Sequence, residues 1–220
     1  MKIRYYGVII IAAAFIFLSG CGNSGGETAE QSTEEHYLTP EEDAKNQTVM
    51  EEYSEDAEFP ELASFLADYY KVPGEYLQET RYYYNYTDLN EDGISEIFAV
   101  VIGETTSDGK GDSALILSMD QEKEFEVLEA FTGLHTPVLI CDEMVNGWHT
   151  IVYPVYGGGQ DAGYRICRYK EGEGYQSEES EFVEELEWMP GIHILADNLI
   201  NDMDEGDYLT LVPRDEVTEQ

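Results

Sequence analysis

Oxygen-bearing side chains recur at alternate positions in one short stretch of the chain, YTDLNEDGISEIFAVV at residues 86–101. Counted from Asp88, they fall at positions 1, 3, 5 and 9, with Gly93 at position 6. Calcium takes about six to eight hard oxygen ligands, and a tightly curling loop turns alternate residues inward around the ion. The spacing therefore predicts a calcium loop with these ligands: the side chains of Asp88, Asn90 and Asp92, the carbonyl of Ile94, and Glu96 directly or through water.

This stretch departs from a complete EF-hand in two ways. An EF-hand has a bidentate glutamate at position 12, where this chain has Ala99, and the flanking sequences are typical of strands rather than helices. A calcium ion would then stabilise a hairpin instead of serving as a sensor. A plain hairpin turn is the alternative, because Asp, Asn and Gly also dominate turns.

Few other residues occur in a pattern that is typical of a catalytic, metal or phosphate site. The four histidines are isolated, with no H-E-x-x-H arrangement, and the sequence contains no G-x-S-x-G nucleophile motif. The glycine run at residues 157–159 has no following lysine or helix start, so it is typical of a hairpin loop rather than a phosphate site. The sequence favours a protein that is not an enzyme, and an enzyme without a recognisable motif is the alternative.

Aromatic residues offer one further surface. Trp148 and the alternating Tyr82, Tyr84 and Tyr86 are of the type that stacks on a glycan. Aromatic residues of strands more often pack in the core or across neighbouring strands. The sequence therefore leaves a protein or a glycan as the ligand.

The first twenty residues have the features of a targeting segment. Lys2 and Arg4 precede an apolar run at residues 8–17, which is too short to span a bilayer as a stable helix. Leu-Ser-Gly then leads into Cys21, as in the lipidation signals of bacterial lipoproteins. We expect a lipid on Cys21 and a location outside the cytoplasm, anchored to the cell membrane; an ordinary secretory signal or an uncleaved anchor is the alternative.

The chain is strongly acidic, with 11 Lys and Arg against 47 Asp and Glu, a formal net charge of −36. Loss of the first twenty residues removes two basic residues and no acidic ones, which leaves −38. This charge excludes duplex nucleic acid as a partner, because binding it needs clustered Lys and Arg. Solubility of a surface protein is the simplest explanation. The charge also permits cationic partners, so an inhibitor or decoy for cationic proteins such as lysozyme is a second hypothesis.

Composition divides the chain into four parts. After a signal peptide at residues 1–20, an acidic polar stretch at 21–58 predicts a disordered tether, 59–212 predicts one folded domain, and 213–220 forms a tail. Cys141 and Cys167 lie in apolar, strand-like runs, where they form either a disulfide or two buried free thiols.

The domain is predicted to be α+β and dominated by an antiparallel sheet or meander. One amphipathic helix is expected after Phe59, with Pro60 at its first position. Turn signals then separate seven strand-like runs: 81–87, 96–102, 114–119, 125–131, 137–141, 150–155 and 163–169. Beyond residue 177, EFVEELEW and ILADNLINDM have the spacing of short C-terminal helices, and DYLTLV predicts an edge strand.

Four segments occur in an order that matches a known pattern: YTDLNEDGISEIFAVV, GKGDSALILSMDQEKEFEVLEAFTGLHTPVLI, NGWHTIVYPVYGGG and YRICRYKEGEGYQSEES. The stretch at residues 81–180 resembles uncharacterised exported and lipoprotein domains of bacteria that are related to FG-GAP-like repeats. The resemblance implies a β-rich exported domain with calcium at the loop, and it implies no activity. We expect a calcium-stabilised binding or envelope-associated module.

Overall fold

The structure is a computed structural model that describes residues 50–107, 109–206 and 208–212. The helices are α2 (Pro60–Tyr70), η1 (Gly74–Tyr76), η2 (Ser177–Glu179) and α3 (Leu199–Glu205). The strands are β1 (Met50–Glu51), β2 (Arg81–Thr87), β3 (Glu96–Ile102), β4 (Asp112–Met119), β5 (Phe125–Leu134), β6 (Val138–Val145), β7 (Trp148–Val155), β8 (Gly163–Cys167), β9 (Glu181–Val183), β10 (Gly191–Ile194) and β11 (Leu209–Thr210).

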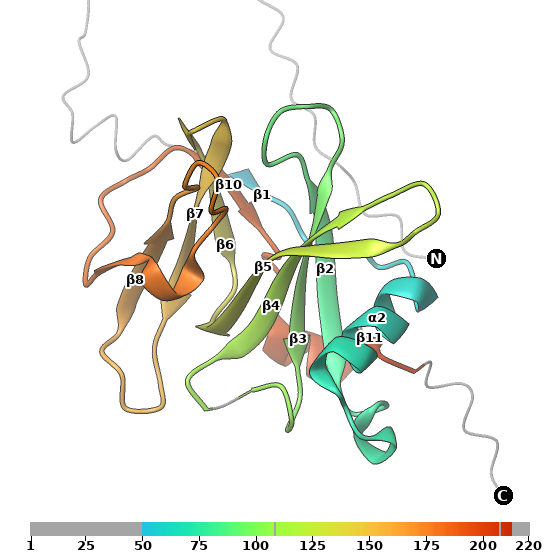
Figure 1. The fold of residues 1–220 in the computed structure, drawn as a ribbon. Coiled ribbons are helices and arrows are strands. Elements are labelled where there is room, and N and C mark those ends of the chain that lie inside the picture. The colour runs from blue at the N-terminus through green and yellow to red at the C-terminus, as the bar shows by residue number, and fades with distance from the viewer. Residues whose placement is uncertain (1–49, 108, 207, 213–220) are drawn as a thin grey trace, which may run out of the picture. The chain divides into compact units, whose positions relative to one another are not determined.

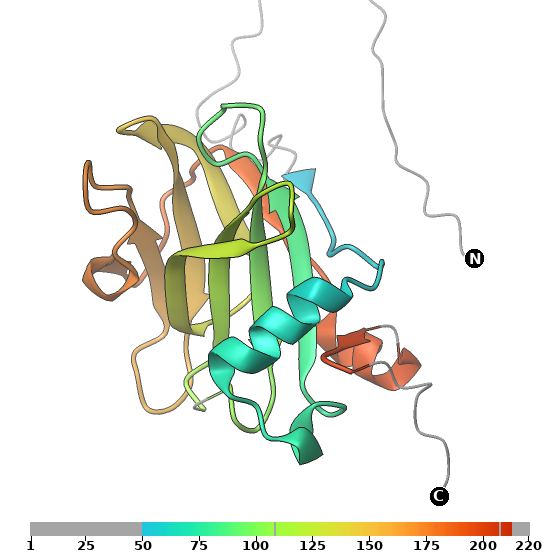
Figure 2. The same ribbon diagram turned by 45° about the vertical axis from the view of Figure 1, so that its right-hand side comes forward.

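Two sheets and helix α2 form three layers (Figures 1 and 2). The first sheet has the order β11-β2-β3-β4-β5, and the second has the order β1-β10-β6-β7-β8-β9. Helix α2 covers one face of the first sheet, and the second sheet covers the other face. Among the described strands every pair is antiparallel except β1 with β10. The predicted mainly antiparallel β structure is confirmed.

The central strands of the first sheet bury both of their faces. On β2, Tyr83 points into the core between the sheets, while Tyr82 and Tyr84 point towards α2. On β3, Phe98 and Ile97 divide between the same two cores. Successive side chains of a strand point to opposite faces, so a strand that is covered on both sides becomes apolar along its whole length.

Helix α2 is held on the first sheet by one apolar face. Pro60 occupies the first turn, where a missing backbone N–H costs nothing, and Leu62 and Leu66, four residues apart, are fully buried. Lys71 ends the helix in a left-handed conformation with φ 54°. The helix therefore forms the outer layer over β2 and β3.

Residues 50–58, which we call the N-terminal strap, extend along both sheets. β1 pairs with β10 of the second sheet, and Glu55 donates its backbone N–H to the carbonyl of Tyr84 on β2 at 2.8 Å. The carboxylate of Asp197 accepts the backbone N–H and the hydroxyl of Ser54 at 2.8 and 2.9 Å. Composition predicts a disordered tether that includes this segment, yet in the structure the backbone groups of the strap have partners on both sheets although most of its side chains are polar.

The C-terminal region differs from the prediction in one element. EFVEELEW is not a helix: residues 181–183 form strand β9 against β8, and Val183 and Leu186 pack on the outer face of the second sheet. This long-range pairing overrides a weak helical pattern. In ILADNLINDM, Ile194 is the last residue of strand β10, and helix α3 begins at Leu199. Asn198 caps this helix by accepting the N–H of Asn201. DYLTLV contributes the edge strand β11.

Cys141 and Cys167 are free and buried. Cys141 of β6 belongs to the cluster on the outer face of the second sheet, whereas Cys167 of β8 lies in the core between the sheets. Strand β7 separates the two strands. Burial raises the pKa of Cys141 to about 12 and that of Cys167 to about 11. Of the two states that the sequence allows, the structure has the free thiols.

In the part of the chain that the structure describes, no helix is both long enough and apolar enough to cross a membrane. The predicted signal peptide, the lipidation site Cys21, most of the predicted tether and the tail lie outside the described residues.

We expect Asp197→Asn to lower the free energy of unfolding by about 1–2 kcal/mol, because hydrogen bonds to a charged acceptor contribute more than neutral ones. Asp204→Asn, at an exposed carboxylate of α3, is the matched control. It should change the free energy of unfolding by less than about 0.5 kcal/mol. Urea unfolding of the chain from residue 22 onward measures both. Equal effects of the two substitutions would contradict the anchoring of the strap by Asp197.

The chain from residue 22 onward has two cysteines, Cys141 and Cys167. We expect neither thiol to react with DTNB in the native protein and both to react in guanidinium chloride without reductant, because burial suppresses the thiolate. A denatured, unreduced protein that titrates no thiol would show a disulfide and contradict the structure.

Candidate calcium loop

The 88–96 loop joins two neighbouring strands of the first sheet. β2 ends at Thr87 and β3 begins at Glu96, and these two residues pair across the hairpin. The strands on both sides agree with the predicted sheet context. They exclude the helix–loop–helix arrangement of an EF-hand.

Side-chain oxygens of the loop bind its own backbone N–H groups. The carboxylate of Asp88 accepts the N–H groups of Asp92 and Gly93 at 3.2 and 2.8 Å. The amide oxygen of Asn90 accepts the same N–H of Asp92 at 3.0 Å, and the carboxylate of Asp92 accepts the N–H of Ile94 at 2.7 Å. Oxygens of Asp88 and Asn90 therefore meet at one backbone nitrogen, an arrangement that is also found in turns.

Two residues of the loop have a left-handed backbone conformation. The φ angle is 86° at Gly93 and 56° at Glu91. Glycine adopts this region without steric cost because it has no Cβ. Position 6 of the loop thus has the conformation that a sharp turn requires, as the spacing predicts.

Glu96 lies at the buried end of the loop. The residue is 5 % exposed, and its Oε2 accepts the backbone N–H of Leu89 at 2.9 Å. Burial raises the pKa of Glu96, the N–H of Leu89 opposes this, and the charges of Asp92 and Asp88 raise it further. Three carboxylates that share one short loop repel one another, so a cation among them would be electrostatically favourable.

Leu89 attaches the loop to the second sheet. Its side chain is fully buried in the core between the sheets, and its carbonyl accepts the backbone N–H of His149 on β7 at 2.8 Å. Its own N–H is held by Glu96. One residue therefore links a loop carboxylate to both sheets, and the loop is a joint between them rather than a free hairpin tip.

The sequence does not indicate the partners of this joint. Nε2 of His149 lies 3.6 Å from Oε1 of Glu91, and its Nδ1 lies 2.7 Å from the carbonyl oxygen of Cys141. The hydroxyl of Tyr175 donates to the carbonyl of His149 at 2.6 Å. These residues are far apart in the sequence, so no local spacing connects them.

The donors of the loop are of the chemical class that calcium prefers. Carboxylate and amide oxygens come from Asp88, Asn90 and Asp92, with Glu96 beside them. Among the described residues, no three His, Cys, Asp or Glu side chains converge closely enough to hold a metal ion by themselves. The spacing also predicts the Ile94 carbonyl as a ligand, with Glu96 binding directly or through water. The amide nitrogen of Asn90 donates to Asp92 at 3.0 Å, a bond that equally serves a plain turn.

The aromatic residues do not form a common platform for a glycan. Tyr82 and Tyr84 are 2 % and 3 % exposed and lie beneath α2. Trp148 instead stacks on Tyr169, with ring centroids 4.7 Å apart, against the core between the sheets. The two parts of the predicted surface thus lie on opposite faces of the first sheet. Only Tyr86 of the tyrosine stripe is exposed.

We expect Leu89→Ala to lower the free energy of unfolding by about 2–5 kcal/mol, because it removes a fully buried side chain and leaves a cavity. Ile94→Ala is the matched control in the same loop: Ile94 is 66 % exposed, and its substitution should cost less than about 0.5 kcal/mol. Urea unfolding compares the two variants. A similar small effect for both would mean that the loop is not anchored through Leu89.

Comparisons with known proteins give no relative for this chain: no protein-family model matches it, and neither a curated protein nor a solved structure matches it significantly. The resemblance to FG-GAP-like domains therefore stays a prediction from the motifs of residues 81–180.

Proposed function

We propose that the chain is a bacterial surface lipoprotein, held at the membrane by a lipid on Cys21, whose folded part is a non-catalytic binding module with one structural calcium ion. The observation that carries the calcium proposal is the double role of the 88–96 loop. Oxygens of Asp88 and Asn90 meet at the N–H of Asp92, the Asp92 carboxylate accepts the N–H of Ile94, and Leu89 joins the two sheets. The lipid anchor rests on the sequence motif alone.

The ion would supply positive charge in a loop whose charged residues are all acidic. Asp88 and Asp92 keep the loop curled through backbone N–H groups, and the N–H of Leu89 orients Glu96. With few protein ligands, a dissociation constant of about 10⁻⁴–10⁻³ M, as in extracellular modules, is the natural range. That range suits an exported protein, and it makes the ion a stabiliser of the joint.

Calcium should raise the melting temperature of the chain from residue 22 onward. At a calcium concentration about a hundred times the dissociation constant, binding to the native state alone adds about 2.7 kcal/mol. For a domain of this size, that corresponds to roughly 5–11 °C in Tm. Asp92→Ala should lose this increase, because it removes a ligand. Calorimetry in calcium and in chelator measures the shift.

Controls separate a bound ion from general screening of a net charge of −38. Magnesium at the same concentration should give a smaller shift, because it requires a near-octahedral site. Asp204→Ala removes an exposed carboxylate outside the loop and should keep the full calcium effect. The proposal fails if Asp92→Ala and Asp204→Ala respond to calcium equally, or if magnesium matches calcium.

A further inference from the structure

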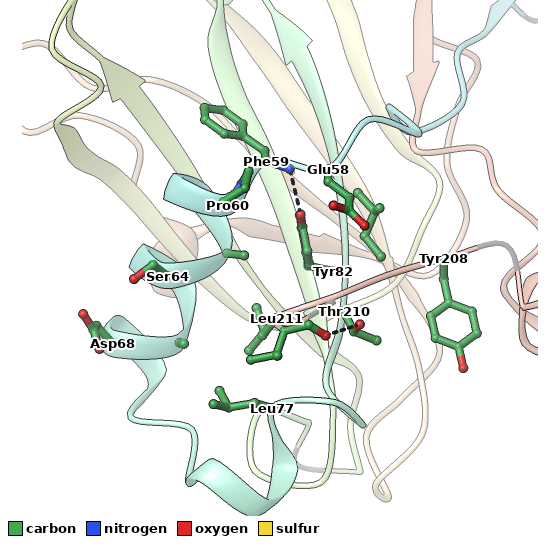
Figure 3. A pocket seen from close by; sticks show the side chains of 14 residues that line it. Glu58, Phe59, Pro60, Ser64, Asp68, Leu77, Tyr82, Tyr208, Thr210 and Leu211 are labelled. Atoms are coloured by element: carbon green, nitrogen blue, oxygen red, sulfur yellow. Dashed lines mark hydrogen bonds between the residues drawn. The ribbon is translucent and has the colours of Figure 1, made fainter. Parts of the chain in front are cut away.

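A groove of about 730 Å³ lies between helix α2 and strand β11. Figure 3 shows Glu58 and Leu77 at its two ends, with Tyr82 and Leu211 between them. Pockets for small ligands commonly have volumes of about 300–1,000 Å³. The groove lies outside the candidate calcium loop, which none of its lining residues belongs to.

The groove is open because α2 presents small side chains to it. Pro60, Ala63, Ser64 and Ala67 line it, and their spacing places them on one side of the helix. The bulky Leu66 of α2 is instead fully buried in the cluster with the first sheet and does not line the groove. Helix α2 therefore leaves space beside β11.

Strand β11 presents its edge to this space. Residues 208–212 all line the groove, whereas a strand seen face-on offers only alternate side chains. β11 is the end strand of the first sheet, and the N–H of Leu211 donates to the carbonyl of Thr80 at 3.2 Å. In antiparallel pairing, the backbone groups of the preceding residue, Thr210, then point away from β2. Thr210 is 8 % exposed, and its hydroxyl donates to the carbonyl of Val212 at 2.8 Å. An added strand would therefore have to meet the backbone groups of Thr210 along the floor of the groove.

The charged residues that line the groove are both acidic. Glu58 and Asp68 line it, and no Lys, Arg or His is present among its described lining residues. Burial raises the pKa of the Tyr82 hydroxyl, the N–H of Phe59 lowers it, and the charge of Glu58 raises it. The chain's own tail, PRDEVTEQ at residues 213–220, has three acidic side chains and one arginine. Its net charge has the same sign as the groove, so the tail is not a complementary ligand.

We infer that the groove binds an extended cationic peptide segment of another protein, which adds as a strand along β11 and places a Lys or Arg side chain beside Glu58. Apolar side chains of the segment would lie on the half-buried Leu77 and Leu209, which also line the groove. This inference names the ligand class of the proposed binding module. It requires neither the calcium ion nor the lipid.

A peptide titration at physiological salt tests the main-chain and charge requirements. The probe is a fluorescently labelled hexapeptide of alternating Lys and Val, added to the chain from residue 22 onward. We expect saturable one-to-one binding, at least tenfold weaker binding of the alternating Glu and Val peptide, and at least tenfold weaker binding when alternate backbone nitrogens of the Lys–Val peptide are methylated. Equal binding of the methylated peptide would overturn strand addition, and the absence of binding at millimolar peptide would overturn the site.

Matched variants locate the site on the molecule. Glu58→Lys changes an exposed lining residue and should weaken binding at least tenfold, whereas Glu171→Lys makes the same charge change at an exposed residue elsewhere and should weaken it less than twofold. Ser64→Tyr narrows the groove without changing charge and should also weaken binding at least tenfold. If Glu58→Lys and Glu171→Lys weaken binding equally, the interaction is general charge attraction and the inference is wrong. A free polyamine that competes as well as the peptide would also overturn it, because the groove would then be a site for small cations.

Each titration is run in calcium and in chelator. Binding that is equal in both conditions supports the groove independently of the loop. Binding that requires calcium would overturn the inference, because the groove would then depend on the ion. The melting experiment on Asp92→Ala decides the calcium proposal separately.

Discussion

The first sheet has two apolar faces, and the rest of the structure covers them or holds a cover in place. Tyr82 and Tyr83, adjacent on β2, belong to different cores, one beneath α2 and one facing the second sheet. Burial of a large apolar side chain contributes about 1.5–3 kcal/mol, so neither face of β2–β5 can stay exposed. The hydrophobic effect is not directional, however, and it does not fix how the layers are oriented.

Hydrogen bonds at the edges of the sheets fix how the layers are oriented. Leu89 joins the β2–β3 hairpin to β7, Ser54 joins the N-terminal strap to Asp197, and the hydroxyl of Ser177 donates to the carbonyl of Ala130 on β5 at 2.7 Å. Each net contribution is about 0.5–1.5 kcal/mol, small beside the cores but specific in geometry. At several of these contacts a carboxylate accepts a backbone N–H. Part of the large excess of acidic residues, a net charge of −36, therefore has a structural role.

The sequence predicts the elements whose bounds depend on neighbouring residues. The expected strands at 81–87 and 96–102 have the bounds of β2 and β3, because turn-forming residues such as Asp92 and Gly93 separate the two runs. Strand β9, the ordered strap and the contact of Leu89 with His149 depend on partners far away in the chain, so no local period reveals them. The same holds for the groove. Its lining comes from α2 and the residues before it, from Leu77 and Tyr82, and from residues 208–212, and only the fold brings these together.

The central claim is that the 88–96 loop is an oxygen-lined joint that binds calcium. A titration of the labelled chain with calcium, followed by two-dimensional amide NMR, tests it residue by residue. We expect saturable shifts confined to residues 88–96 and to His149, whose N–H binds the carbonyl of Leu89. Shifts that spread over acidic residues across the surface without saturating, or a loop whose amides do not move, would contradict the claim.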